Sequence, residues 1–244
     1  MSPRPATALM EAPRDQLRGL PIFRDASPAA LDRVSAAAAW RSYAEGALIL
    51  DAHDASSEVW FVLEGSVRIL VRTSAGREMI LGELGPGDMF GEVAAVDGAP
   101  RTAGASALSR SLLCAVPAPA FLEAACSTPA ASLALMRWMT GILRRQSHRS
   151  FEREALPVRL RLCAELLRLS RPRADQGEGN IVSPPPPHHV LAARINSRRE
   201  VVSRELGELA REGLVLRTRG GLVLPRPGEL RYTVEAELEA GATP

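Results

Sequence analysis

Between residues 42 and 120 the hydrophobic positions fall in short runs that glycine turns interrupt. The runs are VWFVLEGSVRILVRT, REMILGELGPGDMF and SLLCAVP, and the turns centre on Gly65, Gly76 and Gly87. Short apolar runs separated by turn residues are typical of antiparallel strands. This region therefore predicts a small antiparallel barrel or β-roll. A short helix over residues 28–40, with proline in its first turn, is expected to precede it.

In the second half of the chain the spacing of apolar positions becomes helical. Leu135, Met139 and Ile142 share a stripe at intervals of three and four, which predicts one long helix over residues 129–154. A second helix is predicted over residues 157–170. Because the first half of the long helix is apolar, this helix either pairs with a second copy of the chain or packs on its own domain.

The C-terminal pattern combines two short helices and a hairpin. In HHVLAARINSRREVVSRELGELAREGLV, two helical stretches meet at Ile195 and Asn196, and asparagine tolerates the left-handed backbone of a sharp turn. LRTRGGLVLP adds two short apolar runs around a Gly-Gly turn. The four prolines of RPRADQGEGNIVSPPPP predict a loop ahead of these helices. The pattern is typical of a helix-turn-helix followed by a small hairpin.

Together these patterns predict an α+β fold whose parts follow one another along the chain. We expect a flexible tail at 1–18, a jelly-roll-like antiparallel β-roll at 19–128, a long dimerisation helix at 129–156, a helix-turn-helix domain at 157–232, and a second tail at 233–244.

Charge separates the two halves of the chain. The 244 residues carry a net charge of +2, and all 30 basic residues are arginine. Residues 43–129 contain 5 arginines and 11 acidic residues, a balance of 5 − 11 = −6. Residues 137–219 contain 17 arginines and 9 acidic residues, a balance of 17 − 9 = +8. A basic C-terminal half indicates a polyanionic partner.

The sequence gives no support to several functional classes. The longest apolar run, ASLALMRWMTGIL, contains Arg137 and is too short to cross a bilayer, and no stretch resembles a signal peptide. We therefore expect a cytoplasmic chain without a membrane partner. The three cysteines are expected to be buried free thiols. The four histidines lack metal-binding spacing, and no nucleophile–base pattern predicts an enzyme.

One segment, FGEVAAVDGAPRTAGASA at residues 90–107, combines the chemistry of an anion site with a hydroxyl acceptor. The first amides of a short helix after Gly91 can bind an anion, and Arg101 can add a bidentate contact to a phosphate. Glu92 repels a phosphate, so its natural partner is a hydroxyl such as that of a ribose. A sugar phosphate satisfies both groups, whereas the alternative is an ordinary surface ion pair of Glu92 with Arg101.

This segment resembles the phosphate-binding cassette of cyclic nucleotide-binding domains, whose usual form is F-G-E-x-A-L-x-x-x-x-P-R-x-A. GREMILGELGPGDMFGE and EVWFVLEGSV are similar to the cAMP receptor protein/fumarate-nitrate regulator family of bacterial transcription regulators, and the resemblance extends from about Leu20 to Leu230. It implies a cyclic nucleotide effector, cAMP rather than cGMP, and no metal. The implied effector-binding residues are Leu81, Gly91, Glu92, Val93, Arg101, Thr102 and, against the base, Ser147 or Ser150.

The resemblance also implies a role for each group of the cassette. Glu92 accepts a hydrogen bond from the ribose 2′-hydroxyl and Arg101 pairs with the cyclic phosphate, while Leu81 lines the wall of the effector site.

Two differences from the family pattern leave the identity of the effector open. Thr102 stands where bacterial cAMP receptors tend to have serine, and Gly104 and Ala105 replace bulkier residues. The alternatives are therefore a regulator of the same fold with another effector or none, and a nucleotide-binding module without specific DNA binding.

SRREVVSREL is similar to the recognition helix of the same family, which implies a winged helix-turn-helix. Glu200 and Arg204 lie about 200° around the helix from Val202, so both are expected to face solvent. Ser197 and Glu200 have the spacing of a capping box, so Glu200 either reads a base or caps the helix. The implied DNA-binding residues are Arg198, Arg199, Glu200, Ser203 and Arg204 on the helix, and Arg217 and Arg219 on the wing. The implied partners are double-stranded DNA with a two-fold site, a second copy of the chain as a homodimer, and RNA polymerase.

Overall fold

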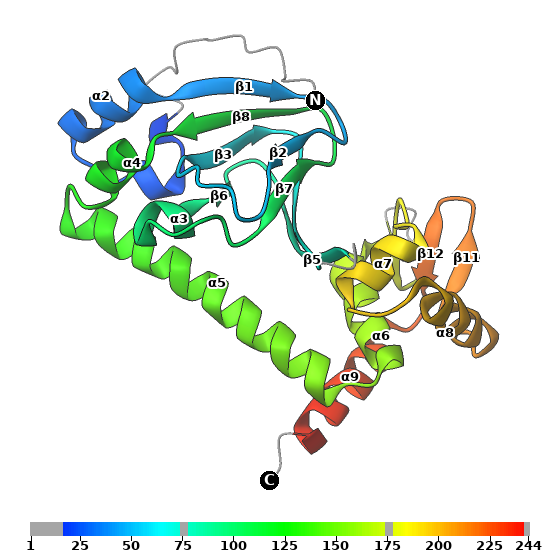
Figure 1. Ribbon diagram of the computed structural model, residues 1–244. Coiled ribbons are helices and arrows are strands. Elements are labelled where there is room, and N and C mark those ends of the chain that lie inside the picture. Colours follow the sequence, from blue (N-terminus) through cyan, green and yellow to red (C-terminus); the bar gives the residue numbers. More distant parts are fainter. Residues whose placement is uncertain (1–16, 74–77, 174–177, 242–244) are drawn as a thin grey trace. The chain divides into compact units, whose positions relative to one another are not determined.

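The computed structural model describes residues 17–73, 78–173 and 178–241, and divides the chain into two compact units at Ile142 and Leu143. The first unit is the predicted β-roll, which lies between helices at both ends of its sequence (Figure 1). Its strands are β1 (Ala39–Tyr43), β2 (Leu48–Leu50), β3 (Val59–Glu64), β4 (Val67–Arg72), β5 (Glu78–Leu84), β6 (Met89–Phe90), β7 (Gly104–Ala107) and β8 (Ser111–Val116). Its helices are η1 (Pro21–Phe23), α2 (Pro28–Ala37), α3 (Glu92–Asp97), α4 (Ala118–Ala125) and the start of α5 (Pro129–Ala155).

The roll consists of two four-stranded sheets in which all strand pairs are antiparallel. The strand orders are β1-β8-β3-β6 and β2-β7-β4-β5. The turns predicted at Gly65 and Gly87 are present, and both glycines have positive φ. The turn predicted at Gly76 lies outside the described residues.

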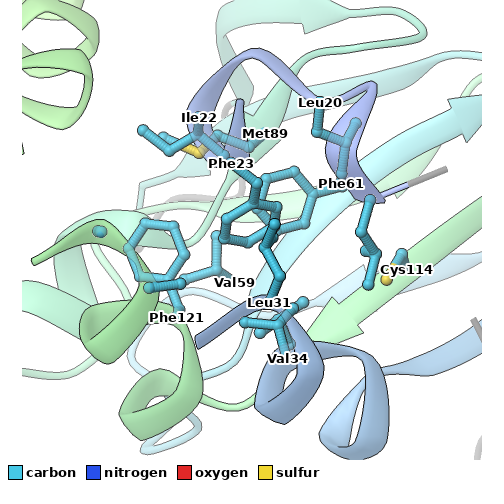
Figure 2. Packing of buried hydrophobic residues seen from close by; sticks show 14 of the residues in the cluster. Leu20, Ile22, Phe23, Leu31, Val34, Val59, Phe61, Met89, Cys114 and Phe121 are labelled. Atoms are coloured by element: carbon cyan, nitrogen blue, oxygen red, sulfur yellow. The ribbon is translucent and has the colours of Figure 1, made fainter. Parts of the chain in front are cut away.

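Strand β3 explains why one stretch of the roll is apolar without alternation. Trp60 and Val62 point into the core between the two sheets, whereas Val59 and Phe61 point into a second core beneath the helices. A strand buried on both faces has no polar side to expose, so its sequence reads as a continuous apolar run. In the second core Phe61 lies 5.1 Å from Phe23 and 6.4 Å from Phe121, ring centre to ring centre (Figure 2).

The second unit contains the predicted helix-turn-helix around its own core. Its helices are the last part of α5, α6 (Val158–Leu169), α7 (His188–Arg194), α8 (Arg199–Arg211) and α9 (Pro227–Gly241). A sheet of order β11-β12-β10-β9 completes it, with β9 (Arg171–Pro172), β10 (Asn180–Val182), β11 (Leu216–Thr218) and β12 (Gly221–Leu224). The β11–β12 hairpin is the predicted wing.

Both expected tails need correction. Residues 1–16 lie outside the described residues, but Leu17 is fully buried in the core beneath the helices and is not part of a tail. At the other end α9 continues to Gly241, so a tail beginning at 233 is wrong. Leu230 and Val234, one turn apart on α9, are buried in the core of the second unit. The helix therefore persists because this face packs against its domain.

The long helix packs part of its predicted stripe on its own domain. Leu135 and Met139 pack on the core beneath the helices, and pairing with a second copy stays a prediction. Leu133, Met136 and Leu143, in contrast, are exposed large apolar residues of the same helix.

The three cysteines are all free. Cys114 and Cys163 are buried as expected, whereas Cys126 is exposed. Burial raises the pKa of the Cys114 thiol to about 12.

Candidate functional site

The cassette is built on a left-handed glycine. Gly91 has φ +86° and ψ 3° and is the residue before α3, a helix of six residues that ends at Gly98 with φ +70°. A Cβ atom on residue 91 lies 2.6 Å from Arg101 Nη1 and 2.8 Å from the Glu58 carbonyl oxygen. Only glycine fits here, because the backbone conformation and the space both exclude a side chain. The first amides of α3 therefore follow a turn that leaves the backbone closely packed against Arg101.

Arg101 is buried and holds the cassette to a distant loop. Its guanidinium is 2% exposed, and its Nη1 donates to the Gly91 carbonyl at 2.8 Å. Nη2 donates to the Glu58 carbonyl at 2.7 Å and lies 3.6 Å from Glu58 Oε2, and Nε donates to Ser56 Oγ at 3.1 Å. A guanidinium has five N–H groups, so each terminal nitrogen keeps a second N–H beyond these three bonds. Arg101 therefore supports the loop with three of its five N–H groups.

Glu92 lies in the same buried region. It is 5% exposed at the first position of α3, and burial raises the pKa of its carboxyl group, while its own backbone amide and the charge of Arg101 lower it. Burial lowers the pKa of Arg101, which the carboxylates of Glu58, Asp54 and Glu92 oppose. Because Glu92 and Arg101 are both buried, the alternative of an ordinary surface ion pair between them is wrong.

The other predicted effector residues have mixed surroundings. Val93 on α3 and Leu81 on β5 are half-buried, and Thr102 is exposed directly after Arg101. Ser147 and Ser150 are exposed on α5, and Ser150 Oγ accepts a hydrogen bond from Arg153 Nη2 at 2.9 Å. The roles of these residues toward a ligand stay predictions.

The turn of the helix-turn-helix has the predicted backbone but a different cap. Asn196 adopts φ +52°, as expected of a left-handed turn residue. Helix α8 begins at Arg199 after Arg198, which makes no side-chain cap bond. Glu200 is therefore the second helical residue rather than the third, and the capping box with Ser197 is wrong. Arg161, which no sequence pattern indicated, contributes to the turn, because its Nη1 donates to the Ile195 carbonyl at 3.0 Å.

Helix α8 presents an arginine-rich face to solvent. Its buried stripe is Val202, Leu206 and Leu209, as expected. The exposed side chains around the first half of α8 and on the wing are Arg198, Arg199, Glu200, Arg204, Arg217 and Arg219, of which Glu200 and Arg204 lie opposite the buried stripe. Arg204 Nη2 donates to Glu205 Oε1 at 3.1 Å. Ser203 departs from this pattern: it is half-buried, and its Oγ lies 2.6 Å from His188 Nδ1 on α7.

A buried ionic cluster that spacing did not reveal joins three helices of the second unit. Glu165 on α6 is 4% exposed, and its Oε1 accepts from Arg194 Nη1 on α7 at 2.9 Å. Its Oε2 accepts from Arg168 Nε at 3.0 Å, and Arg168 Nη1 reaches both oxygens of Glu152 on α5 at 2.8 Å. The carboxylate of Glu165 thereby bonds the end of the first helix of the helix-turn-helix to α6, and Arg168 continues the chain of bonds to α5.

The described residues offer neither a metal site nor a membrane span. No group of three or more His, Cys, Asp or Glu residues among the described ranges could hold a metal ion. No helix within those ranges is both long and apolar enough to cross a membrane.

Comparisons with known proteins agree with both halves of this architecture. The profile of the cyclic nucleotide-binding domain matches residues 40–126, and that of the Crp-like helix-turn-helix domain matches residues 160–233. Fold and site therefore define a DNA-binding transcription regulator that carries a cyclic nucleotide-binding domain. The cyclic AMP receptor protein of Thermus thermophilus is 32% identical over 204 residues, covering 82% of this chain and 89% of its own length. The chain belongs to the cAMP receptor protein/FNR family, whose members are transcription regulators and not enzymes.

One further relative and two solved structures are also similar to this chain. A CRP-like cAMP-activated global transcriptional regulator of Mycobacterium tuberculosis is 26% identical, with 80% of this chain and 87% of the relative covered. The crystal structure of a CRP/FNR-family transcriptional regulator from Thermus thermophilus superposes with a TM-score of 0.64 at 26% identity, covering 80% of this chain and 98% of that one. A c-di-GMP responsive regulator of Xanthomonas campestris shares the fold, with a TM-score of 0.68 at 21% identity, covering 81% of this chain and 99% of that one.

Proposed function

We propose that this regulator binds cAMP in the cassette and that the ligand raises its affinity for a two-fold DNA site. The observation that carries the proposal is the burial of Glu92 and Arg101 beside the left-handed Gly91. A buried guanidinium with two further N–H groups suits the two exocyclic oxygens of a cyclic phosphate. A carboxylate beside it suits a ribose hydroxyl. The names of the relatives from Thermus thermophilus and Mycobacterium tuberculosis, which refer to cAMP, favour adenine as the base.

The remaining predicted residues complete the proposed effector site. The first amides of α3, together with Val93 and Thr102, would complete the phosphate cradle. Leu81 would line the wall of the site. Ser147 or Ser150 on α5 would offer a polar group to the base.

The same proposal gives α8 and the wing the contact with DNA. Arg199 and Arg204 are expected to read guanines and Glu200 a base amino group in the major groove. Ser203, Arg198 and the wing residues Arg217 and Arg219 are expected to contact phosphate or sugar. Homodimerisation through the exposed apolar residues of α5 would place two copies of α8 on half-sites about one helical turn apart. Action in the cytoplasm and contact with RNA polymerase are part of this proposal through the family resemblance alone.

Calorimetry on the full chain tests the effector. We expect cAMP to bind more tightly than cGMP and both to bind more tightly than 5′-AMP, which lacks the cyclic phosphate. A mobility-shift assay on a randomised palindrome pool should show that cAMP increases DNA affinity about 5- to 150-fold, the usual range of allosteric coupling. An absence of heat with either cyclic nucleotide at millimolar concentration would contradict the effector assignment.

A second candidate is a regulator of the same fold that needs no cyclic nucleotide. The three hydrogen bonds from Arg101 to Gly91, Glu58 and Ser56 favour it, because they give the guanidinium a structural role of its own. In that case the selected DNA is bound equally well with and without cAMP. The mobility-shift assay therefore distinguishes the two candidates directly.

Alanine substitutions on α8 test the DNA contact. Arg199→Ala and Arg204→Ala should each weaken binding to the selected site by about 1–3 kcal/mol, and relax selectivity at one base position, because each removes a guanine contact. Fluorescence anisotropy on matched and mismatched duplexes measures both effects. Arg211→Ala, at the far end of the same helix and exposed, is the control and should change little. If all three variants bind alike, the chain is better described as a nucleotide-binding module.

A further inference from the structure

A histidine of α7 contacts the face of α8 that carries the DNA-reading residues. His188 Nδ1 lies 2.6 Å from Ser203 Oγ, which is a short hydrogen bond, and both side chains are half-buried. From the sequence, the four histidines were notable only for lacking metal-binding spacing. The contact joins the first residue of α7 to a half-buried serine in the first half of α8.

Two arginines from different elements act on the charge of the same imidazole. Arg199 lies on α8 and Arg217 on β11, and both act on His188 electrostatically. Burial, and then these two positive charges, lower the pKa of His188 from its ordinary value of 6.5. In the free protein the ring therefore gains its second proton only in more acidic solution than an exposed histidine does. On its own helix the neighbouring His189 is exposed.

We propose that His188 is a proton-responsive positioning residue that sets the direction of the Ser203 hydroxyl toward DNA. The inference rests on the proposed role of α8 in DNA binding. A neutral imidazole either accepts or donates at Nδ1, depending on its tautomer, whereas a protonated imidazole can only donate. Once His188 is protonated, its Nδ1–H donates to Ser203 Oγ. The hydroxyl proton of Ser203 then no longer takes part in the hydrogen bond with His188 and can be donated to a phosphate or base oxygen.

Protonation has a second effect on the same surface. It adds a positive charge beside Arg199 and Arg217, where a DNA phosphate would reduce the repulsion among the three cations. Bound DNA therefore raises the pKa of His188, and binding takes up a proton. The sign follows from this linkage: DNA affinity is unchanged at pH values above the pKa of the bound state and increases as the pH falls through it.

The test uses the full chain and the duplex that it selects from the randomised palindrome pool. Anisotropy titrations at constant ionic strength should show affinity rising about fivefold for each protomer between pH 8 and pH 6. His188→Asn should remove most of this increase, because an amide cannot titrate, and should leave binding at pH 8 nearly unchanged. His189→Asn is the matched control and should retain the increase. Ser203→Ala should reduce the increase while leaving the smaller contribution of the histidine charge.

Nuclear magnetic resonance of the histidine rings gives an independent measurement. The His188 signal should titrate at a higher pH with the duplex than without it, and Ser203→Ala should move the titration of the free protein. A pH dependence that His188→Asn leaves intact, or a wild-type chain that binds the duplex equally at pH 6 and pH 8, would overturn the proposal while leaving DNA binding in place. A chain that selects no duplex at either pH contradicts the DNA-binding role itself, and this inference with it.

Discussion

Arg101→Ala is expected to weaken cAMP binding by about 2–5 kcal/mol, or at least about 30-fold, because the substitution removes the buried cation that is proposed to pair with the phosphate. The same change leaves the carbonyls of Gly91 and Glu58 without the donors they have in the structure. Loss of such a partner costs about 1–3 kcal/mol of stability when the group stays buried. The variant should therefore both bind poorly and unfold more easily.

Two further variants separate these effects. Arg101→Lys keeps the charge but loses the fork-shaped guanidinium, so it should recover only part of the affinity. Glu58→Gln removes the charge that lies 3.6 Å from Arg101 Nη2 but keeps the Glu58 carbonyl contact, and should bind cAMP nearly as the wild type does. Calorimetry measures affinity and thermal unfolding measures stability. Wild-type cAMP affinity in a folded Arg101→Ala variant would show that Arg101 has a structural role only.

Glu165→Ala is expected to lower the free energy of unfolding of the second unit by about 3–5 kcal/mol, because it removes the buried carboxylate that the guanidinium of Arg194 bonds. The Arg194 side chain is 9% exposed and bonds Glu165 directly, so its guanidinium cannot be fully solvated in the folded domain. Arg168 loses the same carboxylate but stays paired with Glu152. The loss of stability is therefore expected mainly in α7 and in its contact with α6.

Hydrogen exchange measures this loss where it occurs. Amides of α6 and α7 should lose protection in Glu165→Ala, while those of β3 and β8 in the roll should keep it. Glu208→Ala is the matched control, since Glu208 pairs with Arg211 on the exposed face of α8 and its removal should cost less than about 1 kcal/mol. The double variant Glu165→Met/Arg194→Met should regain much of the stability. Equal protection in Glu165→Ala and Glu208→Ala would contradict the proposed importance of the cluster.

Features that depend on near neighbours were predictable from the sequence. The left-handed Asn196 and the stripe of Val202, Leu206 and Leu209 follow from the backbone preference of one residue type and from helical periodicity. The family resemblance likewise indicated Glu92 and Arg101, because the cassette is a continuous segment. The precise start of α8 was not predictable, because a shift of one residue barely alters the apolar pattern.

Features that depend on contacts between distant residues were not predictable. Two of the three oxygens that Arg101 bonds belong to residues 43 and 45 positions earlier in the chain, and Glu165 and Arg194 are 29 positions apart. No local spacing indicates which of the arginines reaches a given buried carboxylate. The length of α9 was not predictable either. Only Leu230 and Val234 are buried along it, so its apolar pattern is weak, and the helix is stabilised by packing against its domain.

The exposed cations of α8 and the wing are all guanidinium groups, and the chain contains no lysine. Enzymes that acetylate lysine therefore have no side chain to neutralise on this surface. Methylation of arginine would keep the charge while blocking bidentate contacts, so it would alter the reading of bases more than the general attraction to phosphate. Reagents directed at amines should likewise leave this surface intact, whereas dicarbonyl reagents that modify arginine should abolish its affinity for nucleic acid.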